Sequence, residues 1–376
     1  MAEDIATYLG PKGYSIKKEH LTIQEQELIR KELTVKAFVP KSSISQPTPF
    51  PVYRESPKKI YVPRFYGVNT YGEPDAIKIS DGEDIDIPFA GDLRDFQKPI
   101  VKKYVESAKT KGAGLLEVHC GAGKTVMALK IISELKKKTL VIVHKEFLLQ
   151  QWTERINQFL PTAKVGRIQG KIIDIEGKDI VIGMLQSLSM KKYPTSLFQQ
   201  FGLTIIDETH HIAAEVFSNA LFQIVTKYML GLSATMERKD RLTFVIKMFI
   251  GEVVYKKERD TSNDIVTVKG INYEIDDEEF SKVEYNFKGQ VHYSKMIKKL
   301  CEFNRRTEFI IKVLDNSLKE NPAQQFIVLA HNKNVLKYLH DAIKDRKIAT
   351  VGYYIGGMKQ KDLKISETKK VIIATY

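Results

Sequence analysis

A short run of glycine, lysine and threonine has residue types suited to phosphate chemistry. The run consists of Gly121, Ala122, Gly123, Lys124 and Thr125. It follows a strand-like, mostly apolar stretch at 115–118 and precedes apolar residues at helical spacing. Glycine turns would therefore direct backbone N–H groups and a helix N-terminus at phosphate oxygens. Lys124 would then reach the β- and γ-phosphates, and the hydroxyl of Thr125 would bind Mg²⁺. The pattern predicts a phosphate-binding loop, although Val118 stands where the general motif has its first glycine. A glycine-rich turn that binds nothing is the alternative.

A pair of acids ends another apolar run. Asp207 and Glu208 follow residues 203–206, which predict a buried strand. Two acids in that place are costly in free energy unless they have a function. Beside a phosphate-binding loop, Asp207 would hold Mg²⁺ through its water shell and Glu208 would activate the attacking water, so Lys124, Asp207 and Glu208 are the predicted catalytic residues. A helix-capping acidic pair is the alternative. No zinc site is predicted at the adjacent histidines 210 and 211, because companion ligands at useful spacing are lacking.

The elements around these motifs alternate between short β-branched runs and helical patterns. Strands are expected at 115–118, 139–143, 180–183, 203–206 and 228–232, with a helix at 147–159. Such alternation predicts right-handed crossovers and a parallel sheet covered on both faces. A second α/β start follows, with expected helices at 292–303, 305–319 and 334–343, and strands at 325–330, 350–354 and 370–374.

The predicted organisation has four parts. Residues 1–92 are expected to form a small, partly β N-terminal module with a helix near 23–33, whose basic and aromatic residues suit either nucleic-acid binding or a half-buried strand surface. Residues 93–255 form the predicted nucleotide-binding lobe. Residues 256–300 are charged and irregular, which indicates a linker or insertion, and 301–376 begin a second lobe that is incomplete.

Composition limits the kinds of partner. The chain has 59 Lys and Arg against 46 Asp and Glu, a formal net charge of +13. This excess favours a polyanionic partner such as nucleic acid, although scattered solvated lysines would give the same total. Cys120 and Cys301 are the two cysteines, which excludes a disulfide framework and fits an intracellular, reducing setting. No run approaches the ~20 apolar residues of a membrane span, so no membrane partner is predicted.

Four motifs, taken in order, resemble those of superfamily 2 helicases and translocases. They are Gln97, the loop at 121–125, the sequence Asp-Glu-Thr-His at 207–210, and Ser233, Ala234 and Thr235. The closer likeness is to the XPB-type group and to the transcript-release helicases of large DNA viruses. It extends over roughly residues 93–376. The resemblance implies RecA-like lobes, ATP and Mg²⁺ as cofactors, and DNA rather than RNA as the nucleic acid.

The resemblance also implies roles for individual residues. Gln97 would recognise the adenine edge, and residues 233–235 would couple the nucleotide state to the nucleic-acid groove. Loops holding one strand's backbone would supply His144, Lys145, Arg167, Gln169, Gly170, Gln186 and Ser187. Solvated charges at Lys145 and Arg167, and a helix cap at Ser187, are the alternatives. Residues 238–240, Arg-Lys-Asp, are similar to the Arg-Glu-Asp element of the XPB-type group, with Lys239 replacing its acid.

The resemblance predicts an ATP-driven helicase or translocase acting in viral transcript release or in repair. RNA polymerase or other transcription machinery would be a partner, in a viral factory, a virion or the nucleus. Residues 373–376 resemble the beginning of the fifth helicase motif, and the arginine-bearing sixth does not follow. We therefore expect a fragment of a longer helicase that binds ATP and hydrolyses it weakly or not at all. The alternatives are a nucleotide-switched scaffold without catalysis, and an NTPase or small-molecule kinase that ignores nucleic acid.

Overall fold

The computed structural model describes residues 6–39, 46–212, 214–257, 267–287 and 289–375. The chain divides into two compact units, 1–263 and 264–376, each described by itself. Within the described ranges, no helix is long and apolar enough to cross a bilayer.

A five-stranded sheet opens the first unit, in the order β5-β6-β2-β1-β7. Its strands are β1 Thr7–Gly10, β2 Gly13–Lys17, β5 Arg54–Glu55, β6 Lys59–Val62 and β7 Ala76–Ile77. The predicted first helix is confirmed as α1 Ile23–Glu32, which begins at a capping box between Thr22 and Glu25. A separate two-stranded sheet pairs β3 Thr34–Val35 with β4 Phe50–Pro51.

Helix α2, Arg64–Tyr71, attaches this small sheet to the rest of the unit. The helix packs on β2 and also on α9, Thr243–Ile250, of the larger sheet. The guanidinium of Arg64 donates to the carbonyls of Lys227 at 3.2 Å and Lys111 at 3.1 Å. Lys227 directly precedes a strand of the larger sheet, and Lys111 ends a helix that covers this sheet. The two sheets of the first unit are therefore joined by helix packing and by a half-buried guanidinium.

The larger sheet has eight strands in the order β11-β10-β12-β9-β13-β14-β8-β15. The strands are β8 Ala113–Val118, β9 Thr139–Val143, β10 Val165–Gln169, β11 Ile172–Asp174, β12 Ile180–Met184, β13 Leu203–Ile206, β14 Tyr228–Ser233 and β15 Val253–Lys257. All neighbours are parallel except β11, which pairs antiparallel with β10. The predicted α/β fold with a parallel sheet is confirmed.

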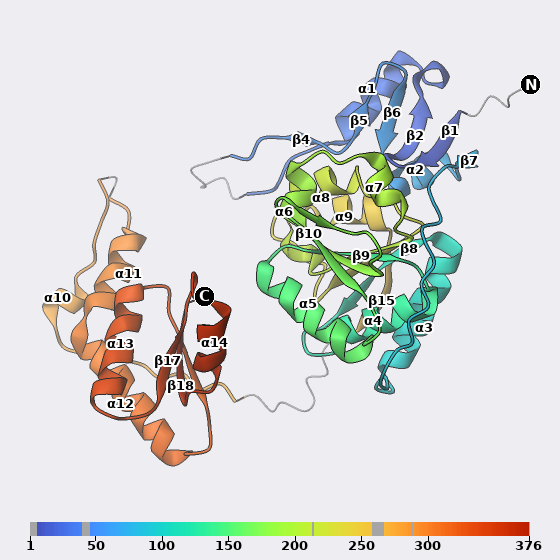
Figure 1. The fold of residues 1–376 in the computed structure, drawn as a ribbon. Helices are drawn as coiled ribbons and strands as arrows, with labels where there is room; N and C mark the ends of the chain where they lie inside the picture. The colour runs from blue at the N-terminus through green and yellow to red at the C-terminus, as the bar shows by residue number, and fades with distance from the viewer. Residues whose placement is uncertain (1–5, 40–45, 213, 258–266, 288, 376) are drawn as a thin grey trace, which may run out of the picture. The chain divides into compact units, whose positions relative to one another are not determined.

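Helices cover both faces of this sheet, because its strands are apolar on both sides (Figure 1). Val141 and Val143 join a core with α3 Gln97–Lys111, α4 Lys124–Leu135 and α5 Glu146–Phe159. The alternate residues, Leu140 and Ile142, join the other core with α6, α7, α8 and α9. The bounds of the first three are α6 Leu185–Met190, α7 Thr195–Gln199 and α8 Ala214–Leu221.

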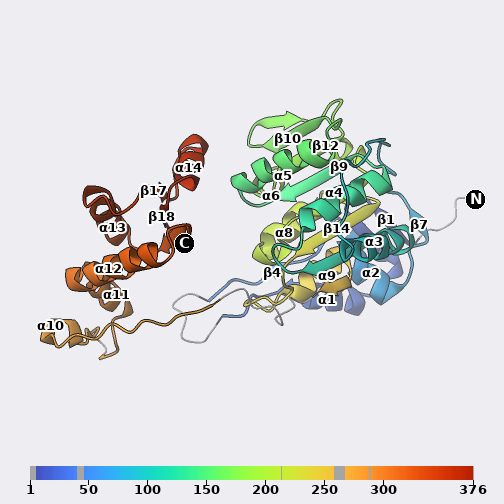
Figure 2. The same cartoon turned by 90° about the horizontal axis from the view of Figure 1, so that it is seen from below.

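The second unit contains a three-stranded parallel sheet in the order β16-β18-β17, with α13 on one side and α14 on the other (Figures 1 and 2). Its strands are β16 Phe326–Leu329, β17 Val351–Tyr354 and β18 Val371–Ala374. Its helices are α10 Glu278–Ser281, α11 Tyr293–Glu302, α12 Asn304–Glu320, α13 Lys333–Asp345 and α14 Gln360–Glu367. Residues 267–277, in the predicted linker or insertion, carry no helix or strand.

Each strand predicted from its apolar run is present within two residues of the expected bounds. The prediction of a loop over 167–170 is wrong, because Arg167 and Gln169 lie on β10. Strand β10 has one parallel neighbour and one antiparallel neighbour near the rim of the sheet. Only Gly166 and Ile168 are buried on it, so its sequence lacks a continuous apolar run.

Gly67 provides a test of how α2 packs. A Cβ at this buried position would lie 2.2 Å from Cγ of Tyr14. Gly67→Ala should therefore lower the free energy of unfolding by about 2 kcal/mol, since overpacking outweighs the gain of up to about 1 kcal/mol in helix propensity. Urea denaturation measures this change, with Asn69→Ala on an exposed position of the same helix as control. Equal or higher stability of Gly67→Ala would contradict the packing described.

Candidate nucleotide and nucleic-acid site

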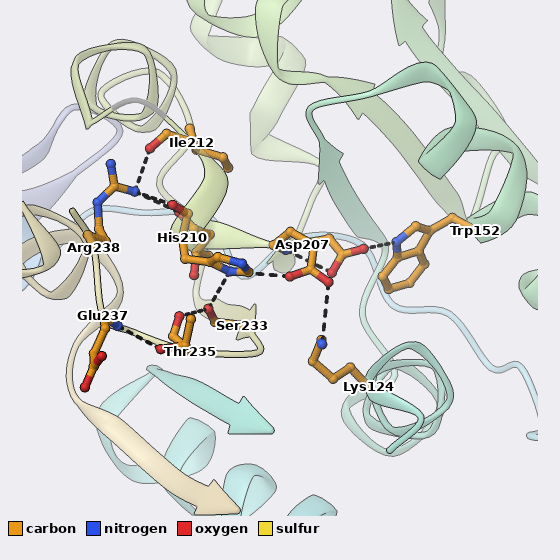
Figure 3. A network of polar contacts seen from close by, with 11 residues as sticks. Lys124, Trp152, Asp207, His210, Ile212, Ser233, Thr235, Glu237 and Arg238 are labelled. Atoms are coloured by element: carbon orange, nitrogen blue, oxygen red, sulfur yellow. Dashed lines mark hydrogen bonds and ion pairs between the residues drawn. The ribbon is translucent and has the colours of Figure 1, made fainter. Parts of the chain in front are cut away.

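The predicted motifs gather at one edge of the eight-stranded sheet. The loop at 121–125 follows β8, the acid pair 207–208 follows β13, and residues 233–235 come at the end of β14. Because β14 pairs with both β13 and β8, Ser233 lies between the acid pair and the loop. Carboxyl ends of parallel strands are where ligands bind in such sheets. Figure 3 shows Lys124, Asp207, His210 and Ser233 facing one another there.

The loop requires glycine at two positions. Gly121 has φ of 82° and Gly123 has φ of 83°, the left-handed region that other residues rarely adopt. A Cβ at Gly123 would also lie 2.5 Å from Nε2 of Gln97. Helix α4 begins immediately afterwards, at Lys124, so its N-terminus opens directly from the loop. This is the arrangement in which backbone N–H groups bind phosphate.

Gln97 holds the loop in shape. Its Nε2 donates to the carbonyl of Ala122 at 2.7 Å, and its Oε1 accepts from the N–H of Arg94 at 3.0 Å. The side chain is buried, and one N–H and one lone pair of its amide remain for another partner. Its recognition of adenine stays a prediction. The contact with Ala122 adds a role in fixing the loop.

Asp207 is 5% exposed and is held by two N–H groups. Its Oδ2 accepts from the indole of Trp152 at 2.8 Å, and its Oδ1 accepts from the backbone N–H of Glu208 at 2.9 Å. Burial raises the pKa of Asp207, while the indole hydrogen bond and the ammonium of Lys124 oppose this shift. The ammonium itself lies 3.5 Å from Oε1 of Glu208. The structure therefore brings the predicted lysine and both predicted acids together.

Glu208 has a strained backbone and an unsatisfied oxygen. Its φ of 49° is in the left-handed region, which is uncommon for a residue with a side chain. Its Oε2 is buried without a hydrogen bond, 3.4 Å from Nδ1 of His210. A buried carboxylate oxygen without a donor is unusual, so this atom is available to a ligand or water.

The donor set fits Mg²⁺ that arrives with a nucleotide. No group of three or more acidic, histidine or cysteine ligands is present among the described residues. Mg²⁺ often uses one or two carboxylates, several waters and the phosphates of its substrate. Asp207, whose two oxygens each accept one hydrogen bond and keep a lone pair, and Thr125, which directly follows Lys124 in α4, provide such a set. Binding of Mg²⁺ by Thr125 and Asp207 stays a prediction.

A hydrogen-bonded chain leads from Glu208 to the predicted coupling segment. The hydroxyl of Ser233 donates to the carbonyl of Thr235, so Ser233 must accept from Nδ1–H of His210, 2.8 Å away. Burial lowers the pKa of His210, which favours the neutral ring. Ser233 is buried, and Ala234 lies between the two linked residues. The nucleotide side of the site is thus in direct contact with residues 233–235.

Arg238 clasps the segment after the acid pair (Figure 3). Its Nη1 donates to the carbonyls of His210 at 3.0 Å and Ile212 at 2.7 Å, and its Nε donates to Oδ1 of Asp240 at 2.9 Å. Lys239 is exposed. The replacement of an acid by Lys239 therefore leaves the contact between Arg238 and Asp240 intact.

The predicted nucleic-acid residues lie on β10 or shortly after the ends of β9, β10 and β12, which are adjacent strands. Gln186 donates to the carbonyl of His144 at 2.8 Å, and Ser187 accepts from the N–H of Gly170 at 2.9 Å. Ser187 lies inside α6, whose N-cap is Met184, so the helix-cap alternative is wrong.

The remaining candidates lie near these contacts. Nε2 of Gln169 donates to Oε1 of Glu146 at 3.4 Å, and Glu146 directly follows Lys145 in the chain. Lys145 and Arg167 are exposed. The structure thus connects the three predicted segments to one another, and their contact with nucleic acid stays a prediction.

Trp152 was not identified from the sequence. It is the single tryptophan of the chain, and it lies on the buried face of α5. A lone tryptophan in an amphipathic helix indicates only a core position. Its hydrogen bond to Asp207 depends on the packing of α5 against β9, the strand that pairs with β13.

Comparisons with known proteins agree with these motifs. The family described as "Type III restriction enzyme, res subunit" matches residues 90–238. A mimivirus protein named "Putative ATP-dependent RNA helicase" is 33% identical over this whole chain and 73% of its own length. The chain belongs to superfamily 2 of the helicases. Membership implies the use and hydrolysis of ATP.

One further named protein and one solved structure match parts of this chain. The "DNA 3'-5' translocase XPB2" of Sulfurisphaera tokodaii is 35% identical over 44% of the chain and 36% of its own length. The solved SWI2/SNF2 ATPase core of Sulfolobus solfataricus in complex with dsDNA is 14% identical, with a TM-score of 0.42, over 78% of this chain and 80% of its own.

The clasp at Arg238 can be tested through stability. Arg238→Lys should lower the free energy of unfolding by about 1–3 kcal/mol, because the partly buried carbonyls lose the forked guanidinium donors, which a single lysine ammonium cannot replace. Urea denaturation measures the change, and Lys239→Ala, one residue along and exposed, is the control. Equal stability of the two variants would rule out the clasp.

Stability should also depend on the ionisation of His144. Burial lowers the pKa of this imidazole, and the charges of Lys145 and His211 add to the effect. Below the ordinary value of ~6.5, the unfolded chain takes up a proton that the folded chain resists, so stability is lost as pH falls. His144→Gln should show a smaller loss on acidification than wild type, measured by denaturation at several pH values. Asn69→Ala, at an exposed position and without a titrating group, is the control and should match wild type. Parallel curves for all three proteins would contradict the assignment.

Proposed function

We propose that this chain is the motor of an ATP-driven translocase on nucleic acid, and that the nucleic acid is DNA. The observation that carries the proposal is the convergence of Lys124, Asp207 and Glu208 at one sheet edge, in contact with residues 233–235 through His210. The similarity to a named DNA translocase over part of the chain supports DNA, although the mimivirus relative is named for RNA.

The division of labour follows from the chain's own groups. The glycine loop and the N-terminus of α4 bind the phosphates, and Lys124 neutralises charge on the transferring group. Bound Mg²⁺ would supply Lewis-acid stabilisation of the phosphates, held by Thr125 and Asp207. Glu208 orients the attacking water with its unsatisfied Oε2 and takes up the proton. Gln97 fixes the loop and recognises adenine with its remaining N–H and lone pair.

Movement along nucleic acid would use the same edge of the sheet, on the side of β13 where β9, β12 and β10 lie. The segments around His144, Gly170 and Gln186 hold the backbone of one strand through polar contacts that carry no sequence information. Arg167 and Lys145, both exposed, add phosphate contacts. The contacts of His210 with Glu208 and Ser233 join the acid pair to residues 233–235, the segment proposed to couple hydrolysis to movement.

The N-terminal module, 1–92, and the second lobe, 301–376, would serve this motor by recognition and by closing on ATP. A place in viral transcript release or in repair, with transcription machinery as partner, is proposed from the XPB-type and viral resemblance.

Loss of nucleotide binding tests the loop. Lys124→Ala should abolish the stabilisation that saturating Mg·ADP gives to the wild-type chain, about 2.7 kcal/mol at 100 times the dissociation constant. Thermal unfolding with and without nucleotide measures it. Lys130→Ala, on the same helix and paired with Glu134 on the surface, is the control and should behave as wild type. Stabilisation of Lys124→Ala equal to wild type would reject the site.

In the longer helicase that the sequence leads us to expect, Glu208→Gln should bind nucleotide as wild type does and lose turnover by about 10²-fold or more, because the general base is gone. ATP hydrolysis is measured with single-stranded DNA, duplex DNA and RNA in parallel. Stimulation by DNA that weakens steeply with salt supports the proposal. Hydrolysis that none of the three nucleic acids changes would favour an NTPase of another class, and equal turnover by wild type and Glu208→Gln would remove the role given to Glu208.

A further inference from the structure

The indole of Trp152, on α5, contacts Asp207, whereas the ammonium of Lys124, on α4, contacts the neighbouring acid Glu208 (Figure 3). Trp152 is 1% exposed, and its Nε1–H donates to Oδ2 of Asp207 at 2.8 Å. A buried indole needs an acceptor for its N–H, and a backbone carbonyl would satisfy that need equally well. Here the acceptor is the carboxylate proposed to bind Mg²⁺.

The two hydrogen bonds of Asp207 fall on different oxygens. The N–H of Glu208 reaches Oδ1 and the indole reaches Oδ2, so rotation of the carboxylate plane would break at least one bond. Each oxygen keeps a lone pair that is free to accept a further hydrogen bond. The side chain is thus fixed in one orientation with both oxygens still available to metal-bound water.

We propose that Trp152 is a positioning residue, which holds the carboxylate of Asp207 in the orientation that binds the hydrated Mg²⁺ of the nucleotide. This inference rests on the proposed function. Outer-shell partners of a metal-binding carboxylate commonly change metal affinity when they are removed. Trp152 acts through Asp207 and does not itself touch the nucleotide phosphates in this proposal.

The test is Trp152→Phe, which keeps a buried aromatic ring and removes the N–H. The matched control is Tyr104→Phe. Tyr104 is also fully buried in this lobe, and its hydroxyl donates to the carbonyl of Met229 at 2.9 Å, so the variant loses one buried hydrogen bond away from Asp207. Both variants should lose stability, and only Trp152→Phe should change the response to Mg²⁺.

The readout is binding of a fluorescent ADP analogue at a series of Mg²⁺ concentrations, followed by anisotropy. Trp152→Phe should need about 10–100 times more Mg²⁺ than wild type for half-maximal binding, and Tyr104→Phe should match wild type. The same Mg²⁺ requirement in all three proteins, each binding the analogue, would overturn the inference and leave the proposed function standing. A wild-type chain that fails to bind the analogue would overturn both.

A second measurement does not depend on the folding of the variant. Because Trp152 is the single tryptophan, the intrinsic emission of the wild-type chain reports on this one indole. Adding Mg²⁺ to the ADP-bound chain should change that emission, since the acceptor of the indole N–H becomes a ligand of the hydrated metal. Identical emission of the ADP complex with Mg²⁺ and with a chelator would overturn the inference.

Discussion

The burial of Asp207 is the constraint on which the site depends. Taking a carboxylate out of water raises its pKa, and hydrogen-bond donors and positive charge nearby oppose that shift. Here an indole, a backbone N–H and a nearby ammonium supply them, each from a different element of the first unit. The strand that ends at this carboxylate, β13, is central in the sheet and fully buried, so its position is set by packing on both faces.

Contacts also lead from the acid pair to residues 233–235, the segment proposed to couple ATP hydrolysis to movement. The next residue, Glu208, adopts a left-handed backbone and leads into a short 3₁₀ turn, Thr209–His211, held by the guanidinium of Arg238. His210 in that turn contacts both Glu208 and Ser233. One imidazole therefore connects the acid pair to residues 233–235. The hydrogen bonds from Arg238 hold the turn that carries this imidazole.

The sequence identified much of this structure because the relevant information is local. Continuous apolar runs such as 139–143 and 203–206 predict buried strands, and their ends coincide with β9 and β13. The glycines at 121 and 123 indicate positive φ, since side chains disfavour that backbone region. Strand β10 escaped prediction because its pairing with β12 and β11, and not its own composition, makes it a strand.

What the sequence determined by itself was the α/β alternation, the glycine loop and the acid pair, all carried by neighbouring residues whose types have strong backbone or burial preferences. Tertiary structure alone decided that Trp152 bonds Asp207, that Arg238 caps the carbonyls after the acid pair, and that Gln97 fixes the loop. These contacts join residues 25 to 55 positions apart. Their partners are brought together by strand order and helix packing, which no local pattern of side chains specifies.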